Sequence, residues 1–270
     1  MRLAPVMTAA VLLMATAETA AHAADTQAVI AGARERIEAT DSRATGRLVQ
    51  VDASGKRISK TFSIKAHWFP GVLDVLIEIA PARNPAENAP SPHPDERVSV
   101  LLEMRPKGQS TIRVFHPHEA APALLPFDQW SQGVAGGDFN YEDLLQPEYY
   151  WQGQTIVKSA RLGAHDCDVL RSAPGASDRS HYAGIETWID RAMGYPVYVE
   201  KTTKNTGSVK EFTSFGLSQS GGVWAARQVE VKVRGRAGST LLMIERGSTH
   251  AKLTSKDFSP VQISRSEDRP

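Results

Sequence analysis

The stretch GGDFNYEDLLQPEYYW, residues 136–151, is the most distinctive segment of the chain and lies near its middle. Its two leading glycines can adopt positive φ angles without a Cβ clash, which predicts a tight turn. Asn140 is a favourable N-cap for a helix, and Glu142 and Asp143 then fall in the first turn, where carboxylates interact favourably with the helix dipole. Pro147 disfavours a helical conformation at the residue before it, so the predicted helix has only one or two turns.

A helix this short is not stable by itself in water, so it must lie on another part of the protein. Aromatic residues on both sides of it indicate an apolar sheet beneath; they are Phe139, Tyr141, Tyr149, Tyr150 and Trp151. Two interpretations fit this pattern equally well. The helix either closes the hydrophobic core after a glycine turn or forms a lid over a ligand site.

The N-terminus has the pattern of a secretory signal. Arg2 provides a positive charge, Pro5–Ala17 is a short apolar run, and Ala21-His22-Ala23 is a small-x-small cleavage site. The apolar run is too short to span a bilayer. We therefore expect residues 1–23 to be a cleavable signal peptide and the mature protein to be exported, to the periplasm in a Gram-negative cell.

The remaining chain is long enough for one large β domain, which we expect at residues 24–260, followed by a polar, disordered tail at 261–270. The net charge of +1 argues against a nucleic-acid-binding protein and does not predict strong attraction to anionic lipid surfaces. The single cysteine, Cys167, cannot form an internal disulfide and is more typical of a small buried apolar residue than of a reactive thiol.

Apolar periodicity predicts one helix followed by many strands. Val29, Ala33 and Ile37 recur every four residues within Asp25–Thr40, as on one face of a helix. Beyond it, a period of two predicts an antiparallel meander of ten to twelve strands, and a proline-rich stretch at 81–96 predicts a mobile surface loop. The predicted strands are Thr45–Val51, Thr61–Trp68, Leu73–Ala80, Val98–Arg105, Ser110–His116, Thr155–Leu162, Cys167–Ser172, Arg179–Ile189, Pro196–Thr202, Ser208–Phe215, Val223–Val233 and Ser239–Ala251.

The sequence contains none of the motifs G-x-S-x-G, G-x-G-x-x-G and H-E-x-x-H, and no Walker loop. The run His116-Pro117-His118 offers two metal-binding side chains, but no third ligand is placed near them. In the run His165–Asp168, a strand conformation directs Cys167 to one face and the two flanking aspartates to the other. These side chains therefore cannot converge on one metal ion.

Asp138, Glu142 and Asp143 are possible paired carboxylates for acid–base catalysis, but helix capping explains them more simply. We therefore predict no catalytic residues, no metal site and no cofactor. An exported, mainly-β chain with apolar sheet faces and no activated nucleophile is more typical of a binding or carrier protein than of an enzyme. An exported hydrolase is the least favoured alternative.

Several segments resemble the LolA-like outer-membrane lipoprotein-sorting proteins. The run Gly136–Leu144, preceded by Trp130–Gly133, is similar to the signature Gly-(Ser/Gly)-Asp-Phe-x-Tyr-Glu-Asp-Leu of that family. Weaker similarities to its strands and its terminal turn lie at residues 188–190, 195–200, 238–242 and 256–259. The similarity extends over most of the chain, from the first predicted helix to about Pro260.

The resemblance implies a mainly-β fold: an unclosed antiparallel β-barrel, or half-barrel, with an N-terminal helix and short helices covering its concave face. It also implies a periplasmic carrier or chaperone that binds lipoprotein acyl chains or other lipids in an apolar groove, for transfer to the outer membrane. The expected partners are an inner-membrane transporter or an outer-membrane acceptor. Nucleic acid is not an expected partner. The alternative is a periplasmic sensor or transporter-accessory protein that binds a protein partner with the same half-barrel.

Acyl chains would bind through burial of apolar surface, which contributes about 0.8 kcal/mol for each CH₂ group. The groove and lid residues that we predict are apolar or aromatic side chains of the signature and of the neighbouring predicted strands. They are Trp68, Phe69, Val100, Leu102, Phe115, Phe139, Tyr141, Leu144, Leu145 and Trp151.

Overall fold

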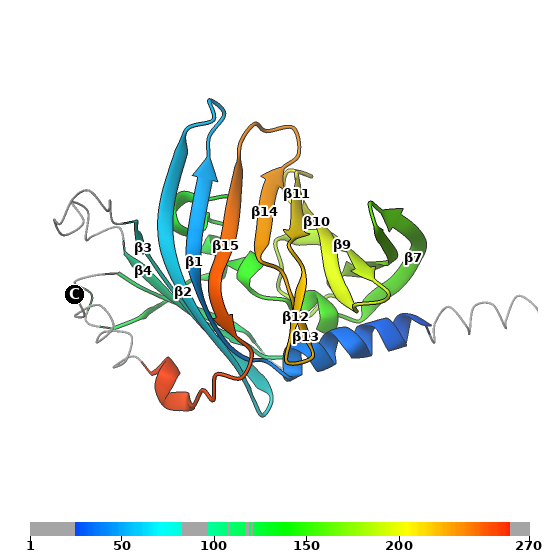
Figure 1. Ribbon diagram of the computed structural model, residues 1–270, viewed down its shortest axis with the longest axis horizontal. Helices are drawn as coiled ribbons and strands as arrows, with labels where there is room; N and C mark the ends of the chain where they lie inside the picture. The colour runs from blue at the N-terminus through cyan, green and yellow to red at the C-terminus, as the bar shows by residue number, and fades with distance from the viewer. Residues whose placement is uncertain (1–24, 83–96, 107–108, 117–118, 120, 260–270) are drawn as a thin grey trace, which may run out of the picture.

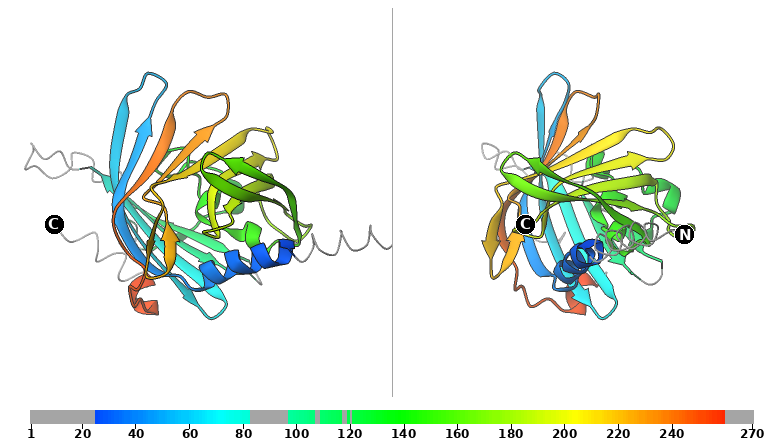
Figure 2. Two further views of the ribbon diagram at one scale, coloured as in Figure 1. Left: turned by 45° about the vertical axis from the view of Figure 1, so that its right-hand side comes forward. Right: turned by 90° about the vertical axis from the view of Figure 1, so that its right-hand side faces the viewer.

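The computed structural model describes residues 25–82, 97–106, 109–116, 119 and 121–259. Its framework is one 13-stranded sheet with the order β6-β5-β4-β3-β2-β1-β15-β14-β11-β10-β9-β8-β7. Within the described residues, the two end strands β6 and β7 are not paired with each other, so the sheet curves without closing (Figures 1 and 2). The predicted mainly-β half-barrel is therefore confirmed.

Two antiparallel meanders form this sheet and meet where β1 pairs with β15. At the junction Leu48 lies opposite Leu242, and Gly46 lies at a bulge where an added Cβ would approach the carbonyl oxygen of Met243 to 1.9 Å. The first meander contains β1 (Asp41–Val51), β2 (Arg57–Phe69), β3 (Val72–Pro81), β4 (Val98–Met104), β5 (Thr111–Phe115) and β6 (Ala123–Leu124). The second contains β7 (Gly153–Leu162), β8 (His165–Ala173), β9 (Tyr182–Asp190), β10 (Tyr195–Thr203), β11 (Val209–Phe215), β14 (Gln228–Val233) and β15 (Ser239–Ser248).

Most of the predicted strands are found, but the predicted strand Val223–Val233 is wrong. It is broken into β13 (Val223–Ala225) and β14, and β13 pairs with the short strand β12 (Ser218–Ser220) in a separate two-stranded sheet. The break follows from the backbone N–H of Arg227, which turns toward the carbonyl oxygens of Phe215 and Gly216. The short strands β6 and β12 were not predicted.

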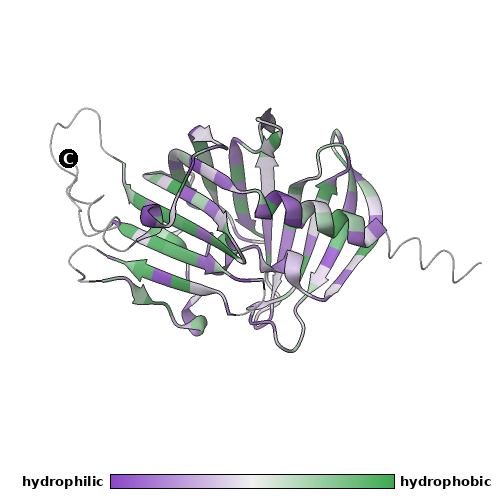
Figure 3. Ribbon diagram, turned by 90° about the horizontal axis from the view of Figure 1, so that it is seen from below, coloured by the Kyte–Doolittle hydropathy of each residue, from purple (hydrophilic) through white to green (hydrophobic). Residues whose placement is uncertain are grey.

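The main hydrophobic core lies on the concave face of the sheet. Alternate residues of each strand point to that face because the side-chain period of a strand is two. On β4, for example, Val100 and Leu102 are fully buried there, while Leu101 between them lies in a different cluster. Figure 3 shows the apolar and polar residues alternating along the strands.

An N-terminal helix, residues 25–38, lies over the concave face (Figures 1 and 2). Its apolar stripe is buried as predicted: Ile30, Ala33 and Ile37 belong to the main core, and Val29 packs against it. Because one face of the helix is anchored in this way, the helix covers part of the opening that the curved sheet leaves.

Residues 127–150, which include most of the distinctive stretch, fill another part of the concave face with short 3₁₀ turns. They are η2 (Phe127–Gln129), η3 (Val134–Gly136), η4 (Glu142–Leu144) and η5 (Pro147–Tyr150). The single helix predicted after Asn140 is therefore two separate turns, because Leu145 is extended and Gln146 adopts φ −128° and ψ 52° before Pro147. The predicted glycine turn is present, with φ of 77° at Gly136.

A smaller cluster lies on the convex face near the C-terminus. The turn η6 (Ser255–Phe258) is held by a capping box between Thr254 and Asp257, and it buries Phe258 against Leu76, Leu101 and Phe115. The predicted signal peptide, residues 83–96 of the predicted loop and the predicted tail lie outside the described residues. In the part of the chain that the structure describes, no helix has the length and apolar character needed to cross a membrane.

Candidate functional site

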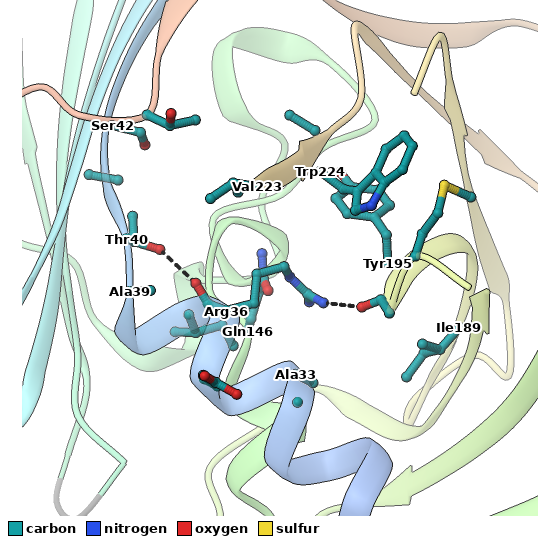
Figure 4. A pocket seen from close by; sticks show the side chains of 18 of the residues that line it. Ala33, Arg36, Ala39, Thr40, Ser42, Gln146, Ile189, Tyr195, Val223 and Trp224 are labelled. Carbon is teal, nitrogen blue, oxygen red and sulfur yellow. Dashed lines mark hydrogen bonds between the residues drawn. The ribbon is translucent and has the colours of Figure 1, made fainter. Parts of the chain in front are cut away.

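A cavity of about 810 Å³ opens between the N-terminal helix and the concave face of the sheet (Figure 4). Its volume falls in the range of small-molecule sites, about 300–1,000 Å³. Its wall is formed mainly by the N-terminal helix, strands β2 to β4, residues 144–146 at the end of η4, the end of β9 with the turn to β10, and the β12–β13 hairpin. The start of β1, Asp168 of β8 and Thr249 complete it. These parts lie far apart in the sequence and come together only when the chain is folded.

The strands contribute an apolar wall to the cavity. The alternation along β2, β3 and β4 places every second side chain on the concave face, and those that reach the cavity are all hydrophobic. They are Ile64, Ala66, Leu73, Val75 and Met104. The helix adds Val29, Ala33 and Ile37 on the facing side, and Leu144 and Leu145 form a surface between η4 and η5 that we call the cavity floor.

Two arginines hold the N-terminal helix to the rest of the fold, and one of them, Arg36, lines the cavity. Arg36 Nη1 donates a hydrogen bond of 2.7 Å to the carbonyl oxygen of Gly194 in the β9–β10 turn (Figure 4). Its guanidinium also lies 5.8 Å from the ring centre of Tyr149 and 5.6 Å from that of Tyr195. Arg34 Nε donates a hydrogen bond of 2.7 Å to the carbonyl oxygen of Tyr149. The helix is therefore held to η5 and to the far half of the sheet.

Several charged side chains on the cavity lining are paired with neighbours. Asp168 accepts a hydrogen bond of 2.6 Å from Arg191, which lowers the pKa of that carboxyl. Asp41 lies 3.1 Å from His67 Nδ1 and also accepts hydrogen bonds from the backbone of residues 252 and 253. The charges of Asp168 and Asp41 are thus compensated within the protein, and the walls from β2 to β4 offer a ligand apolar surface to bury.

A buried ion cluster holds η4 against the sheet. The side chain of Asp143 is completely buried, and its carboxylate forms a hydrogen-bonded ion pair with Lys210 Nζ. The same carboxylate accepts a hydrogen bond of 2.6 Å from Tyr182 Oη and lies 3.5 Å from Lys201 Nζ. Asn140 completes the arrangement. Its side-chain oxygen accepts a hydrogen bond of 2.8 Å from the backbone N–H of Asp143, and its backbone N–H donates a hydrogen bond of 2.9 Å to the Asp143 carboxylate. Asn140 thus makes the reciprocal hydrogen bonds expected of a cap, but the N-cap residue of η4 is Tyr141, one residue later than predicted.

The electrostatics of this cluster identify the acid that carries its charge. Burial by itself raises the pKa of Asp143, but Lys201, Lys210 and the backbone hydrogen bond from Asn140 together outweigh burial and hold the pKa below its ordinary value. Burial dominates at the neighbouring Glu148, whose pKa is raised. Asp143 is therefore the ionised partner of the two lysines.

The adjacent acid of the signature makes a second contact with the sheet. Glu142 is buried and accepts hydrogen bonds from Ser180 Oγ at 2.5 Å and from the backbone N–H of His181 at 3.0 Å. Its carboxylate also lies 2.8 Å from Nδ1 of His181, whose ring stacks on Phe127 with the ring centres 4.2 Å apart. Both acids of the signature thus bind the turn segment to the second meander.

The predicted groove residues fall into three separate places. Most belong to the main core on the concave face: Val100, Leu102, Tyr141 and Leu145 are buried there, and Trp68, Phe139 and Leu144 pack against it. Of the ten, only Leu144 and Leu145 line the cavity. Trp151 is buried in a separate cluster with Tyr182 and Ile185, beneath the second meander.

Phe69 and Phe115 lie on the opposite face of the sheet, so their predicted position in the groove is wrong. Both pack into the convex cluster, and the ring of Phe69 lies 5.8 Å from that of Phe258 in an edge-to-face arrangement. Consecutive strand residues point to opposite faces, so a side chain next to Trp68 on β2 cannot share its face. The same rule separates Phe115 from Val114, which is in the main core.

Sequence reasoning missed most of the residues that line the cavity. Arg36, Tyr195 and Trp224 are among them, each from a different element. The helix stripe that contains Ala33 was a usable signal, because an amphipathic helix must cover something apolar. For Trp224 the signal was weaker: a tryptophan two residues after the glycine pair at residues 221–222.

The remaining predicted features are structural. Cys167 is a buried free cysteine whose pKa is raised by burial to about 11, and Asp168 next to it points to Arg191 instead of toward the thiol. Among the described residues, no group of three or more His, Cys, Asp or Glu side chains is arranged to hold a metal ion. Part of His116-Pro117-His118 lies outside the described residues.

The sequence model of one protein family, described as "Uncharacterized protein", matches residues 91–265, which is more than half of the chain. The chain belongs to this family. A search of curated proteins finds no significant match.

Three solved structures share the fold over nearly their whole length. An outer membrane lipoprotein-sorting protein domain from Vibrio parahaemolyticus aligns with a TM-score of 0.73 and 20% identity, covering 89% of this chain and 98% of that one. A DUF1329 family protein from Desulfovibrio piger aligns with a TM-score of 0.72 and 13% identity, and a LolA superfamily protein from Nitrosomonas europaea aligns with a TM-score of 0.60 and 14% identity. Each of these two alignments covers 88% of this chain and 98% of the other chain. The fold is therefore LolA-like.

Proposed function

We propose that the protein is an exported carrier that shelters acyl chains of lipoproteins or other lipids in the cavity beneath the N-terminal helix. The observation that carries this proposal is the cavity itself: it has a volume of about 810 Å³, it opens to solvent, and all its contacts with β2 to β4 are hydrophobic. A filled core would leave no such space, since protein interiors are close-packed.

The energetics of the cavity favour a hydrocarbon ligand. Each buried CH₂ group contributes about 0.8 kcal/mol, so about a dozen of them contribute about 10 kcal/mol. Association and ordering of the chain cost several kcal/mol of this gain. The remainder corresponds to reversible binding, which a carrier needs because it must also release its ligand.

Two further observations support a role in lipid or lipoprotein transport. One structural neighbour is described as an outer membrane lipoprotein-sorting protein domain, and another belongs to the LolA superfamily. The N-terminal sequence predicts export to the periplasm, where such a carrier would work between an inner-membrane donor and an outer-membrane acceptor. Within the site we assign ligand contact to Leu144 and Leu145 of the cavity floor and to the helix residues that face them.

The test uses Gly32, which lines the cavity and has no atom within 4 Å of the position of an added Cβ. Wild-type protein should take up a fluorescent fatty acid, and protein purified under native conditions should carry acyl lipid detectable by mass spectrometry. Gly32→Trp should lower the affinity at least tenfold, because the indole occupies the cavity. Gly32→Ala is the matched control and should bind normally, while the helix gains about 0.5–1 kcal/mol of stability.

The absence of both co-purified lipid and fatty-acid uptake in the wild type would overturn the proposal. Equal affinity of the Gly32→Trp variant and the wild type would place the ligand elsewhere. A pull-down that returns one stoichiometric protein partner and no lipid would instead favour the sensor or transporter-accessory alternative.

A further inference from the structure

The β12–β13 hairpin is an addition that the main sheet does not need. Strands β11 and β14 are antiparallel neighbours, and their last paired residues are Phe215 and Gln228. Two residues are enough to connect such strands. The chain instead uses residues 216–227, within which β12 and β13 form their own two-stranded sheet, separate from the 13-stranded one (Figures 1 and 2).

This hairpin reaches the cavity. Residues 222–225 form part of the wall, and Figure 4 shows Val223 and Trp224 among the side chains around the cavity. Both side chains are half-buried. An indole has a large apolar surface and few rotatable bonds, so it can cover an apolar ligand at low cost in conformational entropy. The hairpin therefore places its most hydrophobic residues where a ligand would meet solvent.

The backbone of the hairpin is suited to movement. Gly216 at its base has a φ of 63°, and Gly221 and Gly222 at its tip have φ of 58° and 83°. Of the side chains in residues 216–227 that the structure describes, only that of Ala226 is buried. An isolated two-stranded hairpin is marginally stable in water, and segments with few buried contacts open at low free-energy cost.

We propose that the β12–β13 hairpin is a flap that closes over the bound acyl chain, and that Trp224 contacts the ligand there. The inference rests on the proposed carrier function. The ligand supplies the apolar contact that the hairpin's own two strands lack, so it binds the closed flap more tightly than the open one. Closure then slows the release of the ligand without being required for the fold.

Two measurements test the flap. In the first, a variant lacking residues 217–226 and carrying Gly216→Asn and Arg227→Gly joins β11 to β14 by a two-residue Asn-Gly turn. Its melting temperature should stay within a few degrees of the wild type, and its rate of dissociation from a fluorescent fatty acid should rise about tenfold.

In the second, a brominated fatty acid is added to the folded, full-length protein and the quenching of tryptophan fluorescence is measured. Trp224→Phe should remove a large part of the quenching. The control is Trp188→Phe, because Trp188 lies edge-to-face with Tyr198 and does not line the cavity; it should leave the quenching of Trp224 intact.

The outcomes separate the flap from the carrier function. If the wild type binds fatty acid, and the shortened variant releases it at the wild-type rate, the flap is refuted and the carrier function stands. If the shortened variant does not fold, the quenching measurement decides, and equal quenching in wild type and Trp224→Phe refutes the contact. If the wild type takes up no fatty acid, the carrier function fails and the flap fails with it.

Discussion

An Asp143→Asn substitution removes the negative charge at the centre of the cluster that fixes the cavity floor. The neutral amide keeps the shape of the carboxylate, but it leaves Lys201 and Lys210, both nearly inaccessible to solvent, without their ionised partner. Breaking a buried ion pair by removing one partner costs about 3–5 kcal/mol. We therefore expect the free energy of unfolding to fall by about 3–5 kcal/mol at pH 7, a large share of the 5–15 kcal/mol that is typical of a whole domain.

The pH dependence of this loss follows from the pKa of Asp143. Burial raises the pKa, the two lysines and the backbone hydrogen bond from Asn140 lower it, and the net shift is downward. The folded state thus holds the charge at a lower pH than the unfolded state, whose carboxyl titrates near about 3.9. The stabilisation is fully present above that value and is lost as the pH falls through the folded pKa. The difference between wild type and variant should be constant from pH 7 to pH 5 and shrink below pH 4.

Urea unfolding followed by tryptophan fluorescence at pH 7, 5 and 3.5 measures these differences. The matched control is Glu245→Gln, because Glu245 forms an ion pair of 2.6 Å with Arg47 in which both side chains are about half exposed. Such surface pairs contribute about 0–1 kcal/mol. A loss in Asp143→Asn no larger than in Glu245→Gln would refute the reasoning and would mean that apolar contacts alone hold the cavity floor.

Two further predictions concern the cavity floor and the opposite face of the sheet. Leu144→Asp places a charge on the floor and should weaken fatty-acid uptake at least tenfold without unfolding the protein; an unfolded variant would instead make Leu144 a core residue. Asp74→Asn should stabilise the protein by about 1 kcal/mol at pH 7 and by nothing at pH 4, which urea unfolding at the two pH values would measure. Burial, with a smaller effect from Glu103, raises the pKa of Asp74 to about 6, so the wild type loses stability as the pH rises through that value. Equal gains at both pH values would contradict this explanation.

The local elements could be read from the sequence because their signals are local. Alternation with a period of two located most strands to within a few residues, and the stripe of Ala33 and Ile37 located the face of the N-terminal helix that is buried. The hydrogen bonds between Asn140 and Asp143 were also predictable, because they depend on residues only three positions apart. One local rule was misapplied: Trp68 and Phe69 are neighbours on one strand and were both assigned to the groove.

The ion cluster could not be predicted in the same way. Asp143 is 58 residues from Lys201 and 67 from Lys210 in the chain, and the helix-capping explanation of the signature accounted for the acid without them. The available signal was Lys201, which lies two residues after Val199 and therefore on the same face of its strand. A lysine on an inward-facing side of a strand needs a buried partner for its charge. The partner itself depends on where η4 rests on the sheet.

Local sequence patterns were sufficient to locate most of the strands, the apolar face of the N-terminal helix and the glycine turn at Gly136, because these properties depend on neighbours a few residues apart. The open sheet could not be derived from such patterns, nor could the arrangement of Arg36, Leu144 and Trp224 around one cavity. The reason is that both results depend on contacts between distant segments, above all the pairing of β1 with β15, which joins the first strand of the main sheet to the last one in the chain.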